Sequence, residues 1–194
     1  ETMDKTLRYI PEGIFTIADA KRGDIGNTSE QYARTFFETY PYDSVTVAPY
    51  MGADSVKPFL GFENKWAIVL GLTSNAGSAD FQQLVCGDEK LYRKVLKTVA
   101  SWGTPNDTMF VIGATRREQL QEVRELLPDH FFLVPGVGAQ GGDVDTVCRN
   151  AMNKDGGLLI NVSRGIIYAG SGENFADRVA EEAYKYQQEM AAFF

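Results

Sequence analysis

Short apolar runs rich in β-branched and aromatic residues recur along the chain. Each run is followed by a polar or glycine-bearing stretch and then by apolar positions at helical spacing. The runs lie at residues 13–20, 43–50, 65–74, 108–115, 130–137 and 157–165. Nearly continuous apolar runs of this length are typical of parallel strands that are buried on both faces of a sheet. The pattern therefore predicts six β-strands.

Helical patterns separate or follow these runs, at residues 28–40, 78–85, 91–103, 116–128, 143–156 and 172–194. The first begins with a candidate Thr or Ser cap, and the segment before Pro128 alternates charges at helical spacing. A strand–helix unit repeated six times implies a parallel α/β fold with right-handed connections.

Two parallel architectures fit this pattern, an open doubly wound sheet and a closed TIM (β/α)8 barrel. Every apolar run carries its unusual polar residues at its C-terminal end, and in a barrel all these ends open onto one active face. The barrel is therefore favoured, with the chain holding about six βα units, strands three to eight. Residues 1–13 resemble a helix and a turn. We expect one barrel domain, residues 1–194, truncated at its N-terminal side.

Composition and charge limit the classes of partner. The chain has 194 residues, 44% of them hydrophobic and 23% charged, as in a globular protein with one sizeable core. A formal net charge of −7 argues against a nucleic-acid surface, which needs clustered lysines and arginines. No segment approaches the roughly 20 apolar residues that span a bilayer, and the first residues lack the apolar core of a signal peptide. We expect no nucleic-acid or membrane partner.

Cysteine and histidine are scarce: the chain has Cys86, Cys148 and one histidine, His130. The cysteines form no CxxC pattern, so reduced, buried thiols in a cytoplasmic protein are expected. His130 lies in a turn-like segment and is expected to be structural or solvated. These counts argue against Ser-His-Asp or Cys-His catalysis and against a multi-histidine metal site. An enzyme of this composition would depend on lysine and aspartate.

A charged cluster follows the first run, in the sequence DAKRGD at residues 19–24. Residues i and i+2 of a strand point to the same side, so Asp19 and Lys21 are expected to lie side by side. Held within about 4 Å in a partly desolvated pocket, they would keep each other charged, and the ammonium could protonate a carbanion. Asp24 lies beyond the strand end, where it could reach a partner subunit. A salt-bridged strand end without chemistry is the alternative.

Polar groups also follow three later runs. Glycine-rich segments at 135–143 and 162–165 contain Gln140 and Arg164, and such loops let backbone N–H groups approach an anion. In barrels the last two such loops commonly bind phosphate. Ser74, in the segment 71–77, could hydrogen-bond a pyrimidine edge. The alternatives are plain tight turns, a surface charge at Arg164 and a helix cap at Ser74.

The ordered motifs resemble those of the orotidine 5'-phosphate decarboxylase family, in its bacterial branch with the sequence DAKRGDIGxT. The motif DAKRGDIGNT spans residues 19–28. The others follow in the family's order, at residues 46–59, 70–77, 111–115, 133–143 and 161–166. The resemblance covers nearly the whole chain.

This resemblance implies decarboxylation of orotidine 5'-phosphate to UMP, the last step of pyrimidine synthesis, without a metal or other cofactor. It implies that Lys21 donates the proton to C6 and that Asp19 lies beside the substrate carboxylate. Asp24 and Thr28 would reach the neighbouring site of a homodimer. Ser74 would contact the pyrimidine, and the phosphate would be bound by two further side chains, Gln140 and Arg164.

Two alternatives stay open: a related Mg²⁺-dependent sugar-phosphate decarboxylase, and a catalytically impaired nucleotide-binding fragment. The segments TSN and AQGGD argue against the first. The second arises because the family's first two strands supply an Asp for the ribose and another Lys, which have no counterpart in this sequence. If nothing preceded Glu1, we would expect poor stability and little activity.

Overall fold

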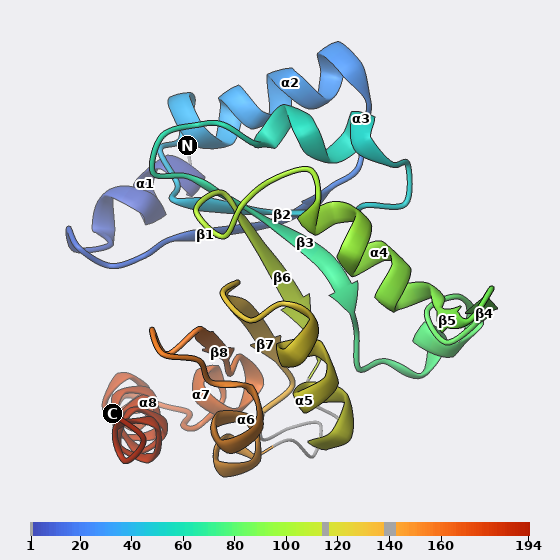
Figure 1. Ribbon diagram of the computed structural model, residues 1–194. Helices are drawn as coiled ribbons and strands as arrows, with labels where there is room; N and C mark the ends of the chain where they lie inside the picture. Colours follow the sequence, from blue (N-terminus) through green and yellow to red (C-terminus); the bar gives the residue numbers. More distant parts are fainter. Residues whose placement is uncertain (1, 114–116, 138–142) are drawn as a thin grey trace. The chain divides into compact units, whose positions relative to one another are not determined.

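Six strands of the chain form one hydrogen-bonded series in the order β1-β2-β3-β6-β7-β8 in the computed structural model, which describes residues 2–113, 117–137 and 143–194 (Figure 1). Their bounds are β1 Ile17–Arg22, β2 Ser44–Val47, β3 Trp66–Leu72, β6 Thr108–Ile112, β7 Phe132–Pro135 and β8 Leu158–Asn161. The pairs β1–β2, β2–β3 and β7–β8 are parallel. Each strand overlaps one predicted run, so the six predicted strands are confirmed.

Helices follow the strands as expected. Their bounds are α1 Thr2–Tyr9, α2 Gly26–Arg34, α3 Ala53–Val56, α4 Leu91–Ala100, α5 Arg117–Leu126, α6 Val144–Ala151, α7 Arg164–Ile167 and α8 Phe175–Ala191. A π-helical turn, η1 Thr35–Thr39, continues α2, and the 3₁₀ turns are η2 Lys57–Phe59 and η3 Ala76–Asp80. None of the described helices combines the length and the apolar composition needed to cross a bilayer.

The predicted helix at 78–85 is wrong. Its place is taken by η3 and by a small antiparallel hairpin of β4 Val85–Cys86 and β5 Glu89–Lys90. The two strands are joined by Gly87 and Asp88, and Gly87 has a φ of +76°. A two-residue hairpin loop needs a positive φ that glycine adopts without a steric cost. Residues 81–85 therefore lead into a turn and form no helix.

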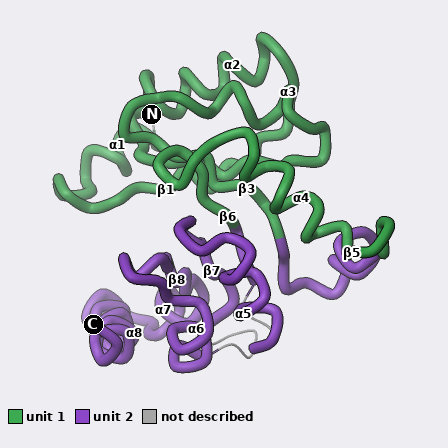
Figure 2. Tube along the Cα trace, in the orientation of Figure 1, with its two compact units in different colours: residues 1–71, 85–110 green, residues 72–84, 111–194 purple. Residues whose placement is uncertain are grey.

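The chain divides into two compact units, residues 1–71 with 85–110 and residues 72–84 with 111–194 (Figure 2). In the first unit all four residues of β2 are buried. The helix α2 lies beside α3 and η2, and the ring of Phe37 contacts the rings of Phe59 and Phe62 at centroid distances of 6.3 and 5.1 Å. Burial of these large side chains is the main stabilising term of this unit.

The second unit packs α5 and α6 together and pairs β7 with β8. Arg124 of α5 donates hydrogen bonds to carbonyl oxygens of five residues, namely Leu127, Pro128, His130, Ala151 and Gly157. Its guanidinium also lies 3.8 Å from the ring centroid of Phe132. Burial lowers the pKa of Arg124 to about 10, against the opposing effect of Asp129, so the side chain stays charged at neutral pH. The Arg124 guanidinium thus supplies hydrogen-bond donors to the backbone carbonyl groups of several segments.

Candidate active site

The Asp19–Lys21 pair lies at the end of β1. The Nζ atom of Lys21 is 2.6 Å from Oδ1 of Asp19, which confirms that the two side chains lie side by side. The Lys21 side chain is 54% exposed and the Asp19 side chain is 62% exposed, so the expected partial desolvation of the pair is absent. A charge pair this exposed contributes little to stability. Its chemical value is the placement of an ammonium beside a carboxylate.

A distorted strand brings this pair together, not the regular alternation that the sequence suggested. Ala18 pairs with Val45 and Arg22 pairs with Val47, so a step of four residues on β1 faces a step of two on β2. Such a bulge re-aims side chains near functional sites. Within the bulge, Lys21 has a φ of +45°, in the left-handed region that non-glycine residues rarely adopt.

The rest of the DAKRGD motif continues from this bulge into α2. Arg22 folds back, donating hydrogen bonds to the carbonyl oxygen of Ala20, and its guanidinium lies 5.0 Å from the ring centroid of Tyr32. Asp24 is half-buried, and its Oδ1 accepts a hydrogen bond from the N–H of Ile25. Thr28 is exposed in α2. Arg22 therefore stabilises the local structure, whereas Asp24 and Thr28 lie close to the chain's surface.

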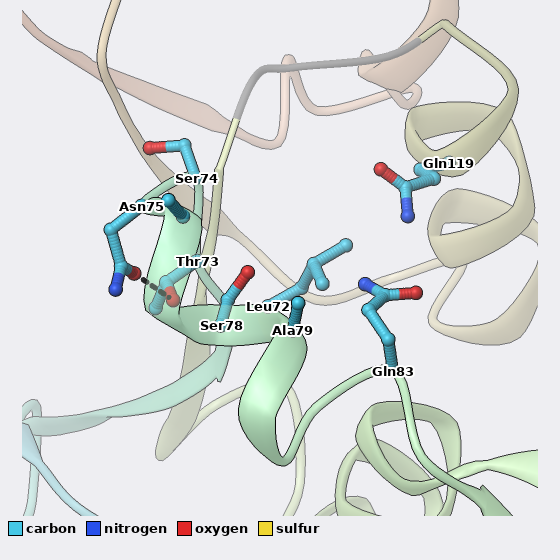
Figure 3. Close-up of a pocket in the computed structure, with 9 residues that line it drawn as sticks. Leu72, Thr73, Ser74, Asn75, Ser78, Ala79, Gln83 and Gln119 are labelled. Carbon is cyan, nitrogen blue, oxygen red and sulfur yellow. Dashed lines mark hydrogen bonds between the residues drawn. The ribbon is translucent and has the colours of Figure 1, made fainter.

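Ser74 lies at the end of β3 and lines a cavity of about 310 Å³ in the second unit (Figure 3). The cavity is also lined by polar side chains from the segment between β3 and η3, from η3, from the turn after it and from α5, namely those of Thr73, Asn75, Ser78, Gln83 and Gln119. The helix cap that the sequence offered as an alternative for Ser74 is not formed, since residue 75 occupies the cap position of η3. Its volume lies at the lower end of the range of small-molecule sites, and its lining is more polar than is usual for them.

Gln82 and Gly113, which the sequence did not indicate as site residues, hold residues 72–74 in place. The side-chain amide of Gln82 accepts a hydrogen bond from the N–H of Thr73 and donates one to its hydroxyl, both at 2.8 Å. Gly113, after β6, donates its N–H to the carbonyl oxygen of Leu72 at 2.7 Å. A Cβ on Gly113 would lie 2.7 Å from the backbone nitrogen of Ser74, a distance that no side chain tolerates. Only glycine therefore fits against Ser74.

A second cavity, of about 200 Å³, brings the two glycine-bearing loops together within the second unit. It is lined by residues 135–137 and 161–165, and Arg164 contributes from the first turn of α7. Both glycine-bearing segments therefore border the same cavity, and phosphate binding by them stays a prediction. Gln140 lies outside the described residues. The arrangement offers one guanidinium and a glycine backbone to an anion.

Other titratable groups near these loops are structural. Asp143 caps α6, accepting a hydrogen bond from the N–H of Thr146 at 2.7 Å, which holds the pKa of its carboxyl below the usual range. Burial, and then the charge of Asp145, raises the pKa of the Cys148 thiol and keeps it protonated. Both cysteines are free, Cys148 buried and Cys86 only partly so. Among the described residues, no three His, Cys, Asp or Glu side chains cluster as metal ligands.

Comparison with known proteins identifies the family. Residues 5–179 match the model of the Orotidine 5'-phosphate decarboxylase / HUMPS family. The orotidine 5'-phosphate decarboxylase of Flavobacterium johnsoniae is 55% identical over 193 residues, which is 98% of this chain and 71% of that protein. That of Christiangramia forsetii is 53% identical over 196 residues, covering 99% of this chain and 72% of that protein.

Solved structures agree with this match. The Leishmania donovani OMP decarboxylase superposes with a TM-score of 0.83 at 34% identity, over 97% of this chain and 73% of that one. The Leishmania donovani UMP synthase superposes with a TM-score of 0.87 at 38% identity, over 98% of this chain but only 42% of that longer one. These likenesses confirm the predicted fold class, an α/β fold of the TIM-barrel type. The chain belongs to the orotidine 5'-phosphate decarboxylase / HUMPS family.

Proposed function

We propose that this chain decarboxylates orotidine 5'-phosphate to UMP in pyrimidine biosynthesis, with Lys21 as the proton donor. The observation that carries the proposal is the Lys21 ammonium held 2.6 Å from the Asp19 carboxylate, at a strand end, in a chain of this family. The barrier of such a reaction lies in the carbanion left at C6. A fixed cation next to that carbon is the feature that lowers it.

The proposed step uses only these two side chains. The bond between C6 and the carboxylate carbon breaks, CO₂ leaves, and the electron pair stays on C6. A proton from Nζ of Lys21 then forms the new C6–H bond, so that the lysine is left neutral until solvent reprotonates it. Asp19 holds the ammonium in place and repels the substrate carboxylate, an interaction that ends when CO₂ departs.

Binding of the remaining substrate groups is assigned to the two cavities of the second unit. Ser74 would hydrogen-bond the pyrimidine, and Arg164, together with Gln140, would bind the phosphate. The support is that Ser74 and Arg164 each line a cavity. Binding energy from a phosphate that does not react can be used to stabilise the transition state.

We also propose a homodimer in which Asp24 and Thr28 reach the site of the neighbouring subunit. Thr28 is exposed and Asp24 is only partly buried, so both remain available to a second chain. The cytoplasmic location expected from the free cysteines is part of the same proposal.

Replacement of Lys21 by alanine tests the reaction. In Lys21→Ala, kcat should fall by at least about 10³-fold because the proton donor is lost. UMP should bind nearly as well, since UMP makes its main contacts elsewhere. The fall in absorbance of orotidine 5'-phosphate gives kcat, and calorimetry gives the Kd of UMP.

Lys94, an exposed lysine of α4, supplies a matched control, since Lys94→Ala removes the same charge away from β1. It should leave both kcat and Kd unchanged. Full turnover in Lys21→Ala would remove this residue from the mechanism, and loss of activity on addition of a chelator would favour the metal-dependent alternative. UMP binding without any turnover by the unmodified chain would point to a nucleotide-binding protein instead.

A further inference from the structure

The bulge in β1 leaves some backbone N–H and C=O groups without the partners that a regular β-ladder with β2 would have given them. Two of them meet side chains instead: the N–H of Lys21 donates to Oγ1 of Thr46 at 2.9 Å, and the carbonyl oxygen of Ala20 accepts from Arg22 at 2.7 Å. Backbone groups at a partly buried strand need such partners, because an unpaired one costs free energy. Side chains therefore stabilise the bulge.

The hydroxyl of Thr46 makes a second hydrogen bond, to the acid of the pair. It donates to Oδ1 of Asp19 at 3.0 Å, and the same oxygen accepts from Nζ of Lys21 at 2.6 Å. A hydroxyl has one proton to donate, which here goes to the acceptor-only carboxylate, and its oxygen accepts the N–H of Lys21. The direction of both bonds is therefore fixed, and they link Lys21, Thr46 and Asp19 in a closed ring.

Thr46 is well suited to hold this ring. It is fully buried in β2, pairs with Ile68 of β3, and lies between Val45 and Val47, which are also fully buried. A β-branched side chain in a packed strand has little rotational freedom. A buried hydroxyl needs hydrogen-bond partners, and both hydrogen bonds described for Thr46 go to the candidate catalytic pair.

We propose that Thr46 is a positioning residue, which holds Lys21 in its left-handed conformation and aims its ammonium along Asp19. This inference rests on the proposed role of Lys21 as proton donor. A left-handed backbone at a non-glycine residue persists only when its surroundings impose it. Without the Thr46 hydroxyl, the Lys21 N–H loses its acceptor, the Asp19 carboxylate loses a donor, and the bulge is free to relax.

Thr46→Val removes the hydroxyl at nearly constant volume and is the main test. We expect kcat for orotidine 5'-phosphate to fall about 10- to 100-fold, because a small misplacement of a reacting group costs rate of that order. The Kd of UMP should stay within about twofold, since Thr46 acts through Lys21 and Asp19. Thr46→Ser, which keeps the hydroxyl, should restore kcat to within a few-fold of the unmodified chain.

Thr108 provides the matched control. It is another fully buried threonine at a strand, and its hydroxyl donates to the Asp107 carboxylate at 3.0 Å. Thr108→Val should therefore lower stability as much as Thr46→Val does while leaving kcat unchanged. If both valine variants lose kcat equally, or if Thr46→Ser fails to restore it, Thr46 has only a structural role.

Amide hydrogen exchange tests the geometry without relying on activity. The Lys21 N–H should exchange at least about tenfold faster in Thr46→Val than in the unmodified chain, and at an unchanged rate in Thr108→Val. Unchanged exchange together with unchanged kcat in Thr46→Val would overturn the inference. Absence of turnover in the unmodified chain, or full turnover in Lys21→Ala, would instead overturn the proposed function, and the exchange rates would still decide the role of Thr46.

Discussion

Lys21 combines a charged side chain with a backbone conformation that usually belongs to glycine. Its φ of +45° is one of two positive values at non-glycine residues among those described, the other being at Asn64. Glycine at this position would relieve the strain but would remove the ammonium. Strained backbone conformations cluster at functional sites, where the function of the side chain outweighs the loss in folding stability.

Gly113 lets Ser74 pack closely against its backbone because glycine has no Cβ atom. In Gly113→Ala the new Cβ would meet the backbone nitrogen of Ser74 at 2.7 Å and its Cβ at 3.0 Å, so the segment must shift. Overpacking of this type costs about 1–3 kcal/mol of stability. We expect the Kd of UMP to rise about tenfold in addition, as Ser74 moves away from the pyrimidine. Calorimetry with UMP and thermal unfolding measure the two effects.

Gly87 provides the comparison for that experiment. Gly87→Ala also strains the chain, since its φ is +76°, but no atom lies within 4 Å of the added Cβ. It should lower stability and leave the affinity for UMP unchanged. Equal losses of affinity in both variants would show that Gly113 does not act through Ser74.

At the scale of elements, the loops after the strands depend on short-range hydrogen bonds. Asp143 ends the glycine-rich loop and begins α6, where its carboxylate accepts the N–H of Thr146. The carboxylate also carries a charge that the N-terminus of a helix favours. This side chain therefore stabilises the first turn of α6.

The cap makes the stability of the second unit depend on pH. The pKa of Asp143 is lower in the folded chain than in the unfolded one, so its contribution is present at neutral pH and is lost as pH falls below about 4. Asp143→Asn keeps a capping oxygen but does not titrate. Urea unfolding at pH 7 and pH 3 should show a smaller loss for Asp143→Asn than for the unmodified chain.

Asp143→Ala is the reference for the cap itself. At pH 7 it should lower the free energy of unfolding by about 1 kcal/mol, the usual value of such a cap. If Asp143→Asn and the unmodified chain lost equal stability between the two pH values, the titration of this carboxyl would not contribute.

At the scale of the whole molecule, the proposed homodimer predicts that two inactive variants complement one another. A mixed dimer of Lys21→Ala and Asp24→Ala contains one site with both residues intact and one site with neither. With random pairing, an equal mixture should recover about one quarter of the activity of the unmodified chain, since half of the dimers are mixed. Each variant alone should be nearly inactive.

The complementation experiment is valid only if the two variants exchange subunits and form mixed dimers. A tag on one variant allows the mixed dimer to be isolated and its turnover measured directly. An inactive mixed dimer would show that Asp24 serves the site of its own chain, and a monomeric chain with full activity would show that no second subunit is needed.

The sequence predicted most elements because their signals are local. Continuous apolar runs identified six strands, since a buried strand needs apolar residues on both faces wherever it lies in the sheet. The hairpin at 85–90 is also locally encoded, by Gly87 and Asp88, but the apolar spacing before it imitates that of a helix. The helix predicted to reach residue 40 continues to Thr39, but its last turn, η1, is π-helical and buries Phe36 and Phe37.

The sequence by itself determined that Asp19 and Lys21 would be close, because only Ala20 separates them, and that Ser74 and Arg164 would follow strands. Tertiary structure alone decided how they are held. Thr46 is 25 residues from Lys21, and Gly113 meets Ser74 from another strand. Such contacts depend on which strands become neighbours and in what register. No local pattern of hydrophobic and polar residues encodes this, because it is set by the packing of the whole sheet.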